Sequence, residues 1–229
     1  NLDDQFKKIR NVLEIGTCDG ANLFPFYKAG FKTIGCDYDS KRLNVGKKFG
    51  LKLNHGDFYQ YIDQGYKADL IILSHVLEHM GDINYQLSNI KKLLAPSGYL
   101  YIEVPGLRGL NRVSKNQLIS DGYVSSNDFL GYLQREHNYC FELRTLQAFP
   151  EKNGFQMIKG DEIVRSLFSI GKQAIDKKPI SCQIPNNKII DYLKIVEEDC
   201  ISQNPWYRKK FRSLYYHLKL IKNKYSHQQ

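Results

Sequence analysis

The sequence lacks the features that mark membrane-spanning, exported and disulfide-built proteins. None of its apolar stretches approaches the ~18 residues that cross a bilayer. Its five cysteines form no C-x-x-C pair and are odd in number, which suits a reducing compartment. No signal-like segment begins the chain. We therefore expect a soluble, cytoplasmic protein.

Acidic residues are missing from one end of the chain. No Asp or Glu follows Asp199, whereas seven cations do, and these carry most of the net charge of +9. From Trp206 onward apolar residues recur at three- and four-residue steps with cations between them, which predicts a basic amphipathic helix. Such a helix could rest on the inner face of an anionic membrane, pair with a protein partner or touch nucleic acid. The alternative is a helix docked on its own domain with its basic face in water.

The length of 229 residues and the 42% hydrophobic content allow one full α/β core with an appendage. We expect one domain over residues 1–170, with an irregular, polar insert at 105–140. Residues 171–229 should form a helical, basic extension. The missing initial Met and the short segment before the first apolar run indicate a processed form or a piece of a longer protein.

Short apolar runs rich in branched residues alternate with helix-like stretches along the first half of the chain. Five runs predict parallel strands: 11–15, 31–37, 51–55, 68–73 and 99–104. Four stretches predict helices: 21–29, 40–50, 59–64 and 85–94. Two later runs, 155–160 and 163–169, predict an antiparallel hairpin at the sheet edge. The fold class is therefore α/β, a doubly wound, mostly parallel seven-stranded sheet with a C-terminal helical extension.

The turn after the first strand is predicted to receive a ligand. Gly16 and Gly20 flank it, and glycine allows positive φ and the close approach of a ligand. Asp37 ends the second strand beside this turn, where a carboxylate accepts two hydrogen bonds from a ribose diol. Glu14 and Asp19 would repel the pyrophosphate of a dinucleotide but tolerate a sulfonium cation with an α-amino group. The alternative is an ordinary strand-turn-helix connection with incidental glycines.

The pattern Glu14-x-Gly16-x-x-x-Gly20 resembles the first motif of the class I, Rossmann-like, S-adenosylmethionine-dependent methyltransferases. The resemblance implies S-adenosyl-L-methionine as the cofactor. It also implies that Asp57 hydrogen-bonds the adenine amino group and that Phe58 covers the ring, while Asp57 could equally cap the following helix. The expected cofactor residues are Glu14, Gly16, Thr17, Gly20, Asp37, Tyr38, Asp57, Phe58 and Ser74.

The segment from Ser74 to Met80 follows the fourth strand and contains His75-x-x-Glu78-His79. This spacing also matches a metalloprotease motif, but that motif requires a long helix and a further ligand. In the resembled family the segment lines the floor where cofactor and acceptor meet. Members that methylate ribose hydroxyls carry E-x-x-E-H here and hold a divalent metal with a later His. This chain has His75 in place of the first Glu, so we expect no metal. The alternatives are a metal site at Glu78 and His79 and a purely structural role for His79.

The region after the insert resembles the pattern E-H-x-x-x-F-x-x-x-T-L…G-F of a methyltransferase subfamily common in bacterial surface-sugar pathways. Thr145 and Gly154 have a structural interpretation as the N-cap and C-cap of a helix. His137 has no such role, and with an unperturbed pKa of ~6.5 it could act as a general base. The expected catalytic residues are His137 and His75, and Glu136 should also face the acceptor.

The resemblance implies methyl transfer to a small-molecule or carbohydrate acceptor. The favoured acceptor is a sugar hydroxyl in cell-surface polysaccharide or nucleotide-sugar metabolism. An RNA 2′-O-methyltransferase is the alternative enzyme, suggested by the basic excess and by Glu78 with His79. The excess positive charge lies on the C-terminal extension and not around the predicted acceptor site, so nucleic acid is not the expected partner. The non-enzyme alternative is a catalytically silent nucleoside-binding module recruited through its C-terminal helix.

Overall fold

The computed structural model describes residues 7–107, 137–161 and 164–170, together with residues 191 and 194. The sheet belongs to one compact unit, residues 1–109 and 135–182. Most of the expected insert at 105–140 and of the basic extension at 171–229 lies outside the described residues, so both remain predictions. Within the described part of the chain, no helix combines the length and apolar character that a bilayer crossing requires.

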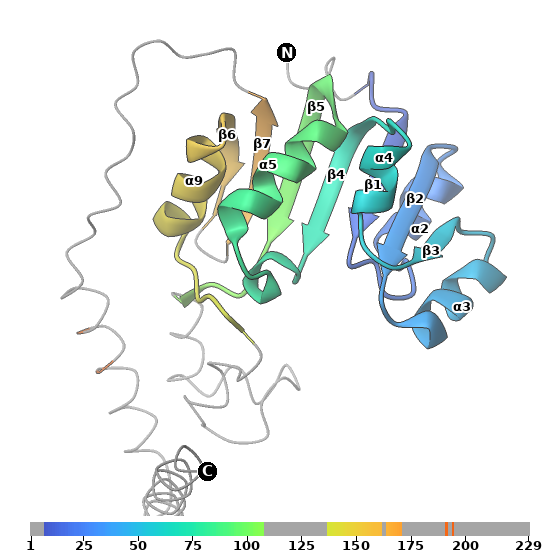
Figure 1. Cartoon of the computed structure of the whole chain (residues 1–229), viewed down its shortest axis with the longest axis horizontal. Helices are drawn as coiled ribbons and strands as arrows, with labels where there is room; N and C mark the ends of the chain where they lie inside the picture. Colours follow the sequence, from blue (N-terminus) through green and yellow to red (C-terminus); the bar gives the residue numbers. More distant parts are fainter. Residues whose placement is uncertain (1–6, 108–136, 162–163, 171–190, 192–193, 195–229) are drawn as a thin grey trace, which may run out of the picture. The chain divides into compact units, whose positions relative to one another are not determined.

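Seven strands form a single sheet in the order β3-β2-β1-β4-β5-β7-β6 (Figure 1). Their bounds are β1 Asn11–Ile15, β2 Lys32–Asp37, β3 Leu53–His55, β4 Ala68–Ser74, β5 Leu94–Glu103, β6 Phe155–Gly160 and β7 Arg165–Ile170. Strands β1 to β5 pair in parallel, whereas β7 runs antiparallel to both β5 and β6. The predicted doubly wound sheet with an antiparallel edge hairpin is confirmed.

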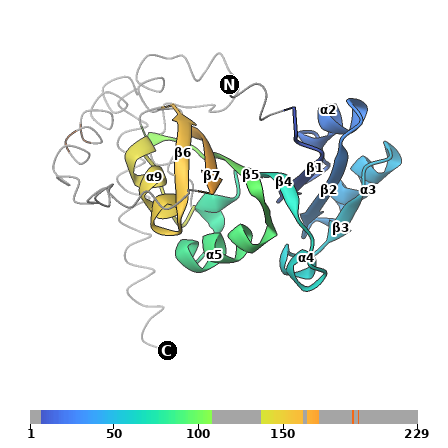
Figure 2. The same cartoon turned by 90° about the horizontal axis from the view of Figure 1, so that it is seen from above.

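Helices cover both faces of this sheet, and Figure 2 shows α2 on one side with α4 and α5 on the other. The helices are α2 Leu23–Lys28, α3 Ser40–Lys48, α4 Tyr59–Asp63, α5 Ile83–Leu93 and α9 Leu143–Lys152, with a 3-10 turn η1 at Leu77–His79. In β4, Leu70 and Ile72 pack into the core under α2 and α3, while Ile71 and Leu73 pack into the core under α4, α5 and α9. Side chains alternate across a strand, so a strand buried on both faces is apolar throughout.

The fifth strand and the last helix begin at other residues than predicted. The strand expected at 99–104 begins at Leu94, because Leu94 already pairs with Ala68, and Tyr99 resumes the ladder at Leu70. The intervening residues bulge out of the ladder. Helix α9 takes Glu142 as its N-cap, and the Thr145 hydroxyl accepts a hydrogen bond from the Glu142 backbone N–H at 3.0 Å. Thr145 therefore stabilises the helix start from inside the first turn.

The strand register brings the predicted site residues to one edge of the sheet. Ile15 at the end of β1 pairs with Cys36 on one side and Leu73 on the other. The turn after β1, Asp37 and Ser74 therefore follow three neighbouring carboxyl ends. Because β2 and β4 flank β1, this edge is also the point where the strand order reverses, which is where doubly wound sheets bind ligands.

Candidate active site

The turn after β1 requires glycine for its own packing. Gly16 has φ 71° and Gly20 has φ 80°, in the region that other residues rarely adopt. A Cβ added at Gly16 would lie 2.3 Å from Cγ2 of Val76, and one at Gly20 would lie 2.5 Å from Cδ1 of Leu51. The sequence predicted positive φ and room for a ligand at these glycines. The positive φ is confirmed, and the close packing of the turn is a further reason for glycine that the sequence did not predict.

The Glu14 side chain stabilises the turn through hydrogen bonds. It is 1% exposed, and its carboxylate accepts hydrogen bonds from the Thr17 hydroxyl at 2.7 Å and the Asn22 amide at 2.8 Å. Burial raises the pKa of Glu14 to about 7, although both hydrogen bonds act in the opposite direction. Glu14 and Thr17, expected to contact the cofactor, are both buried and hold the turn in shape.

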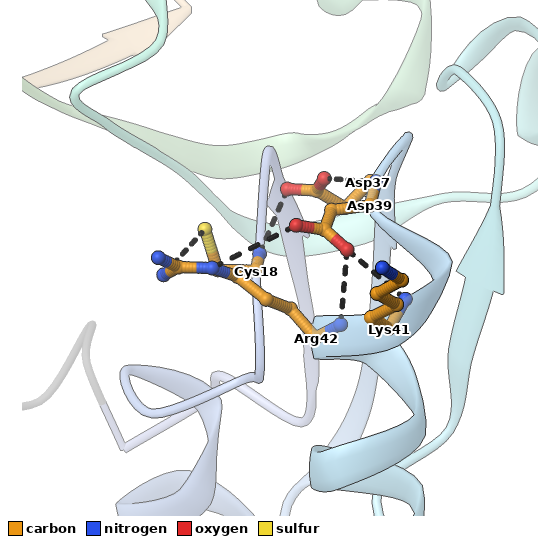
Figure 3. A network of polar contacts seen from close by, with 5 residues as sticks. All are labelled: Cys18, Asp37, Asp39, Lys41 and Arg42. Atoms are coloured by element: carbon orange, nitrogen blue, oxygen red, sulfur yellow. Dashed lines mark hydrogen bonds and ion pairs between the residues drawn. The ribbon is translucent and has the colours of Figure 1, made fainter.

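Asp37 joins the end of β2 to the glycine turn (Figure 3). Its Oδ2 accepts a hydrogen bond from the Cys18 backbone N–H at 2.8 Å, and its Oδ1 accepts one from the Asp39 backbone N–H at 2.7 Å. A carboxylate offers about four acceptor positions. Asp37 thus retains acceptor positions for a ribose diol after it has fixed the turn.

The expected adenine end of the site is only partly as predicted. Tyr38 is 71% exposed, and its ring meets His55 edge-on with 6.5 Å between ring centroids. Asp57 is not the N-cap of α4, which is Phe58, but it accepts a hydrogen bond from the Tyr59 backbone N–H at the helix start at 3.0 Å. Phe58 is 3% exposed and stacks on Tyr59 within the core. Because its ring packs into the interior, Phe58 presents no open face to a ligand, and Tyr38 is an exposed aromatic ring at this edge.

Two polar residues at the carboxyl end of β5 were missed by the sequence analysis. Glu103 accepts hydrogen bonds from the Ser74 hydroxyl at 3.4 Å and the Tyr101 hydroxyl at 3.3 Å. With Asn22 these residues line a cavity of about 490 Å³. The rest of its lining is apolar: Ile9, Phe26, Phe31, Leu70, Ile72 and Leu167. The available signal was a Glu at the carboxyl end of a predicted strand, the same signal that identified Asp37.

Three histidines surround the buried carboxylate of Glu78. Its Oε1 lies 3.5 Å from Nδ1 of His75, 3.9 Å from Nε2 of His79 and 4.0 Å from Nε2 of His137. His137 is held there by the backbone, because the N–H groups of Asn138 and Tyr139 donate to the Glu78 carbonyl oxygen at 2.8 and 3.2 Å. The structure thus brings both predicted catalytic histidines to one carboxylate, while Glu136 lies outside the described residues.

The histidines differ in how open they are. The side chain of His75 is 59% exposed and that of His79 is 42% exposed, whereas that of His137 is 6% exposed. The Glu78 carboxylate raises the pKa of His75, and Glu103 adds to this, while partial burial opposes it. His75 also has φ 55°, so its backbone takes a conformation uncommon for a residue with a Cβ. His75 and His79 are therefore placed to meet an incoming molecule, and His137 lies behind them.

Within the described residues, Glu78, His79 and His137 form a group that could hold a metal ion. One potential ligand atom from each lies within 4.8 Å of the others. The sequence left this possibility as the alternative to a site without metal, and His137 joins the pair from 58 residues further along the chain.

Residues 2–159 match the family model described as a methyltransferase domain. The chain is similar to the ubiquinone biosynthesis O-methyltransferase of Bartonella tribocorum (strain CIP 105476 / IBS 506), with 26% identity over 161 residues that cover 66% of this chain and 62% of the relative. It is also similar to the C-methyltransferase NovU of Streptomyces niveus, with 26% identity over 152 residues that cover 64% of this chain and 33% of the relative. The chain thus spans less than two thirds of the length of these relatives.

Among solved structures, the chain resembles a SAM-dependent methyltransferase from Archaeoglobus fulgidus, with a TM-score of 0.51 and 20% identity over 86% of this chain and 82% of that one. It also resembles the PH0226 protein from Pyrococcus horikoshii OT3, with a TM-score of 0.56 and 15% identity over 74% of this chain and 87% of that one. At these identities the likeness concerns the fold. The chain belongs to the methyltransferase domain family and has the α/β fold of S-adenosylmethionine-dependent methyltransferases.

Proposed function

We propose that this chain transfers a methyl group from S-adenosyl-L-methionine to a hydroxyl group of a small-molecule acceptor. The observation that carries the proposal is the placement of a diol-binding carboxylate, Asp37, and a histidine-lined carboxylate, Glu78, after neighbouring strands of one sheet edge. The methyl group leaves the sulfonium by in-line displacement, so the protein mainly aligns the two reactants and excludes water. A hydroxyl acceptor must also lose a proton.

The donor would lie across the glycine turn. Asp37 would accept hydrogen bonds from the two ribose hydroxyls. Asp57 would accept one from the adenine amino group, beside the exposed ring of Tyr38. Glu14 would act indirectly, through its hydrogen bonds to Thr17 and Asn22. The negative charge of the surrounding carboxylates favours a sulfonium cation over a pyrophosphate.

The acceptor would approach the carboxyl ends of β4 and β5. His75 and Glu103 stand there with proton-accepting atoms, and the Ser74 hydroxyl between them can orient an acceptor oxygen. His137 is buried, so it would position Glu78 and not touch the acceptor. This revises the expectation that His137 itself is the base.

Two acceptor classes have separate support. The pattern around His137 supports a sugar hydroxyl of cell-surface polysaccharide or nucleotide-sugar metabolism. The apolar lining of the cavity beside Ser74 supports a hydroxyl on a ring with an apolar body, and one similar protein is named for ubiquinone biosynthesis. In both cases the acceptor atom is oxygen.

Calorimetry followed by a methyl-transfer assay tests the proposal. The purified chain should bind S-adenosylmethionine and its demethylated product but not NAD. Transfer of labelled methyl should then be compared across nucleotide sugars, apolar phenols and RNA. Tight NAD binding without S-adenosylmethionine binding would overturn the donor assignment. Donor binding without transfer to any panel would favour a silent nucleoside-binding module.

A further inference from the structure

Glu78 is a buried carboxylate with no hydrogen-bonding partner within the described part of the chain. The residue is 0% exposed, and neither side-chain oxygen accepts a hydrogen bond from any residue that the structure describes. The three histidine nitrogens around Oε1 stand at 3.5, 3.9 and 4.0 Å, which is beyond the usual N–H···O range. Removing a carboxylate from water costs several kcal/mol unless a cation or hydrogen bonds compensate it. The surroundings of Glu78 therefore call for a positive charge that lies between it and the histidines.

We infer that Glu78, His79 and His137 form a binding site for one zinc-class dication. Two ligand atoms that share a zinc ion at 2.0–2.2 Å lie about 3.3–3.6 Å apart in a tetrahedral arrangement. The Glu78 oxygen already lies 3.9 and 4.0 Å from the two histidine nitrogens. All three candidate ligand atoms lie within 4.8 Å of one another. A rotation of the partly exposed His79 side chain would therefore have to bring its nitrogen closer to both Glu78 and His137.

The types of ligand atom indicate which metal the site would bind. Two imidazole nitrogens and one carboxylate oxygen suit zinc and its neighbours in the first transition row, whereas magnesium and calcium prefer oxygen ligands. Three protein ligands leave a fourth position open, as in catalytic zinc sites. His75 lies 3.5 Å from the ligating oxygen and would hold Glu78 in place as a positioning residue.

The position of the metal site near the acceptor cavity indicates a role for the ion in catalysis. This role rests on the proposed methyl transfer. The turn η1 that carries Glu78 and His79 follows β4, whose last residue Ser74 borders the acceptor cavity. An ion with an open position there would bind the acceptor oxygen and favour its deprotonated form. An enolate or hydroxyl acceptor would benefit, whereas a carbon nucleophile without oxygen would not.

Metal binding is measured on the full chain after removal of metals with EDTA. Titration with zinc chloride should show one equivalent bound with a Kd below about 1 μM, and magnesium chloride at the same concentration should give no binding. Cobalt(II) should give the visible absorption of a four-coordinate ion. Absence of zinc binding in this range would overturn the site, whether or not the chain binds S-adenosylmethionine.

Two variants test the ligands. Glu78→Gln and His137→Asn should each weaken zinc binding by at least about 100-fold, the upper end of what loss of an outer residue costs. His55→Asn is the matched control, since His55 ends β3 and contacts the Tyr38 carbonyl oxygen at 3.1 Å. It should keep the wild-type zinc affinity.

Folding of the variants is checked without metal. Glu78→Gln keeps the size of a buried side chain whose oxygens accept no hydrogen bond from a described residue. Its metal-free thermal midpoint should therefore equal or exceed that of the wild type, while the rise in midpoint on adding zinc should vanish. Wild-type zinc affinity in both ligand variants, or equal loss in His55→Asn, would show that zinc binds elsewhere. If the wild-type chain binds zinc but transfers no methyl group, the proposed function is wrong and the zinc site still stands.

Discussion

The carboxylate of Asp37 accepts a hydrogen bond from the Cys18 backbone N–H at 2.8 Å, so the end of β2 and the turn after β1 hold each other in place. The same carboxylate is the proposed partner of the ribose diol. Its structural and binding roles can be separated by experiment, because the neighbouring Asp39 lies on the same loop and uses its side chain only toward α3 among the contacts described.

Asp37→Ala should weaken binding of S-adenosylmethionine by about 1–3 kcal/mol, because two charge-assisted hydrogen bonds to the ribose are lost. Isothermal titration calorimetry measures this directly. Asp39→Ala is the control. It removes the N-cap of α3 and should cost about 0.5–2 kcal/mol of stability, yet leave donor affinity nearly unchanged. Equal affinity in Asp37→Ala and wild type would refute the ribose assignment.

Gly16→Ala should destabilise the fold by about 2–4 kcal/mol. The left-handed backbone accounts for about 1–2 kcal/mol and the clash with Val76 for the remainder. The 2.3 Å approach to Val76 can be relieved by Val76→Ala, whereas the φ of 71° cannot. Urea denaturation of the two single variants and the double variant should therefore show partial rescue. If Val76→Ala gives no rescue, the close packing of the turn is not what excludes a Cβ.

Sequence reasoning succeeded where a pattern and a position along one strand were sufficient. Continuous apolar runs predicted β1 and β4, and the end of the second run correctly predicted Asp37 beside the glycine turn. Phe58 was misjudged because its burial depends on how α4 packs on the sheet. Glu103 was missed because its contact with Ser74 follows from the β4 to β5 register, which shifts at a bulge. Periodicity contains no information about such a shift.

The histidine cluster shows the same limit at longer range. The Ser74 to Met80 segment identified Glu78 as a residue of interest, and His137 was selected separately from its own motif. Glu78 and His137 are 59 positions apart, and half of the residues between them lie outside the described part of the chain. Neither motif indicates that Glu78 and His137 lie close together in space. The structure was needed to convert two separate catalytic candidates into one group around a buried carboxylate.

Glu14 should make stability depend on pH around neutrality. Burial raises its pKa from 4.5 to about 7 in the folded chain. A raised carboxyl pKa means that the folded state holds the proton more tightly than the unfolded state. The resulting contribution is complete below about pH 4.5, where both states are protonated, and is lost as pH rises through 7. The free energy of unfolding of the wild type, measured against Glu14→Gln by urea denaturation, should fall across this window. A difference that is constant between pH 4.5 and 8 would contradict the raised pKa.

Asn138 should affect turnover without affecting the donor. Its side-chain amide donates to the His79 carbonyl oxygen at 2.8 Å, and its backbone N–H donates to the Glu78 carbonyl oxygen, so it fastens the segment of His137 to η1. Asn138→Ala removes the bond to His79 and a longer one, from the same amide to the Met80 carbonyl oxygen at 3.4 Å. This loss, worth about 1 kcal/mol, should lower kcat by roughly 5-fold while the S-adenosylmethionine affinity stays at the wild-type value. Ser88→Ala is a suitable control, because it removes a comparable side-chain bond, to the Tyr85 carbonyl oxygen on the exposed side of α5. A similar drop in kcat for Ser88→Ala would attribute the effect to general loosening. An unchanged kcat in Asn138→Ala would mean that the position of His137 beside Glu78 does not limit the reaction.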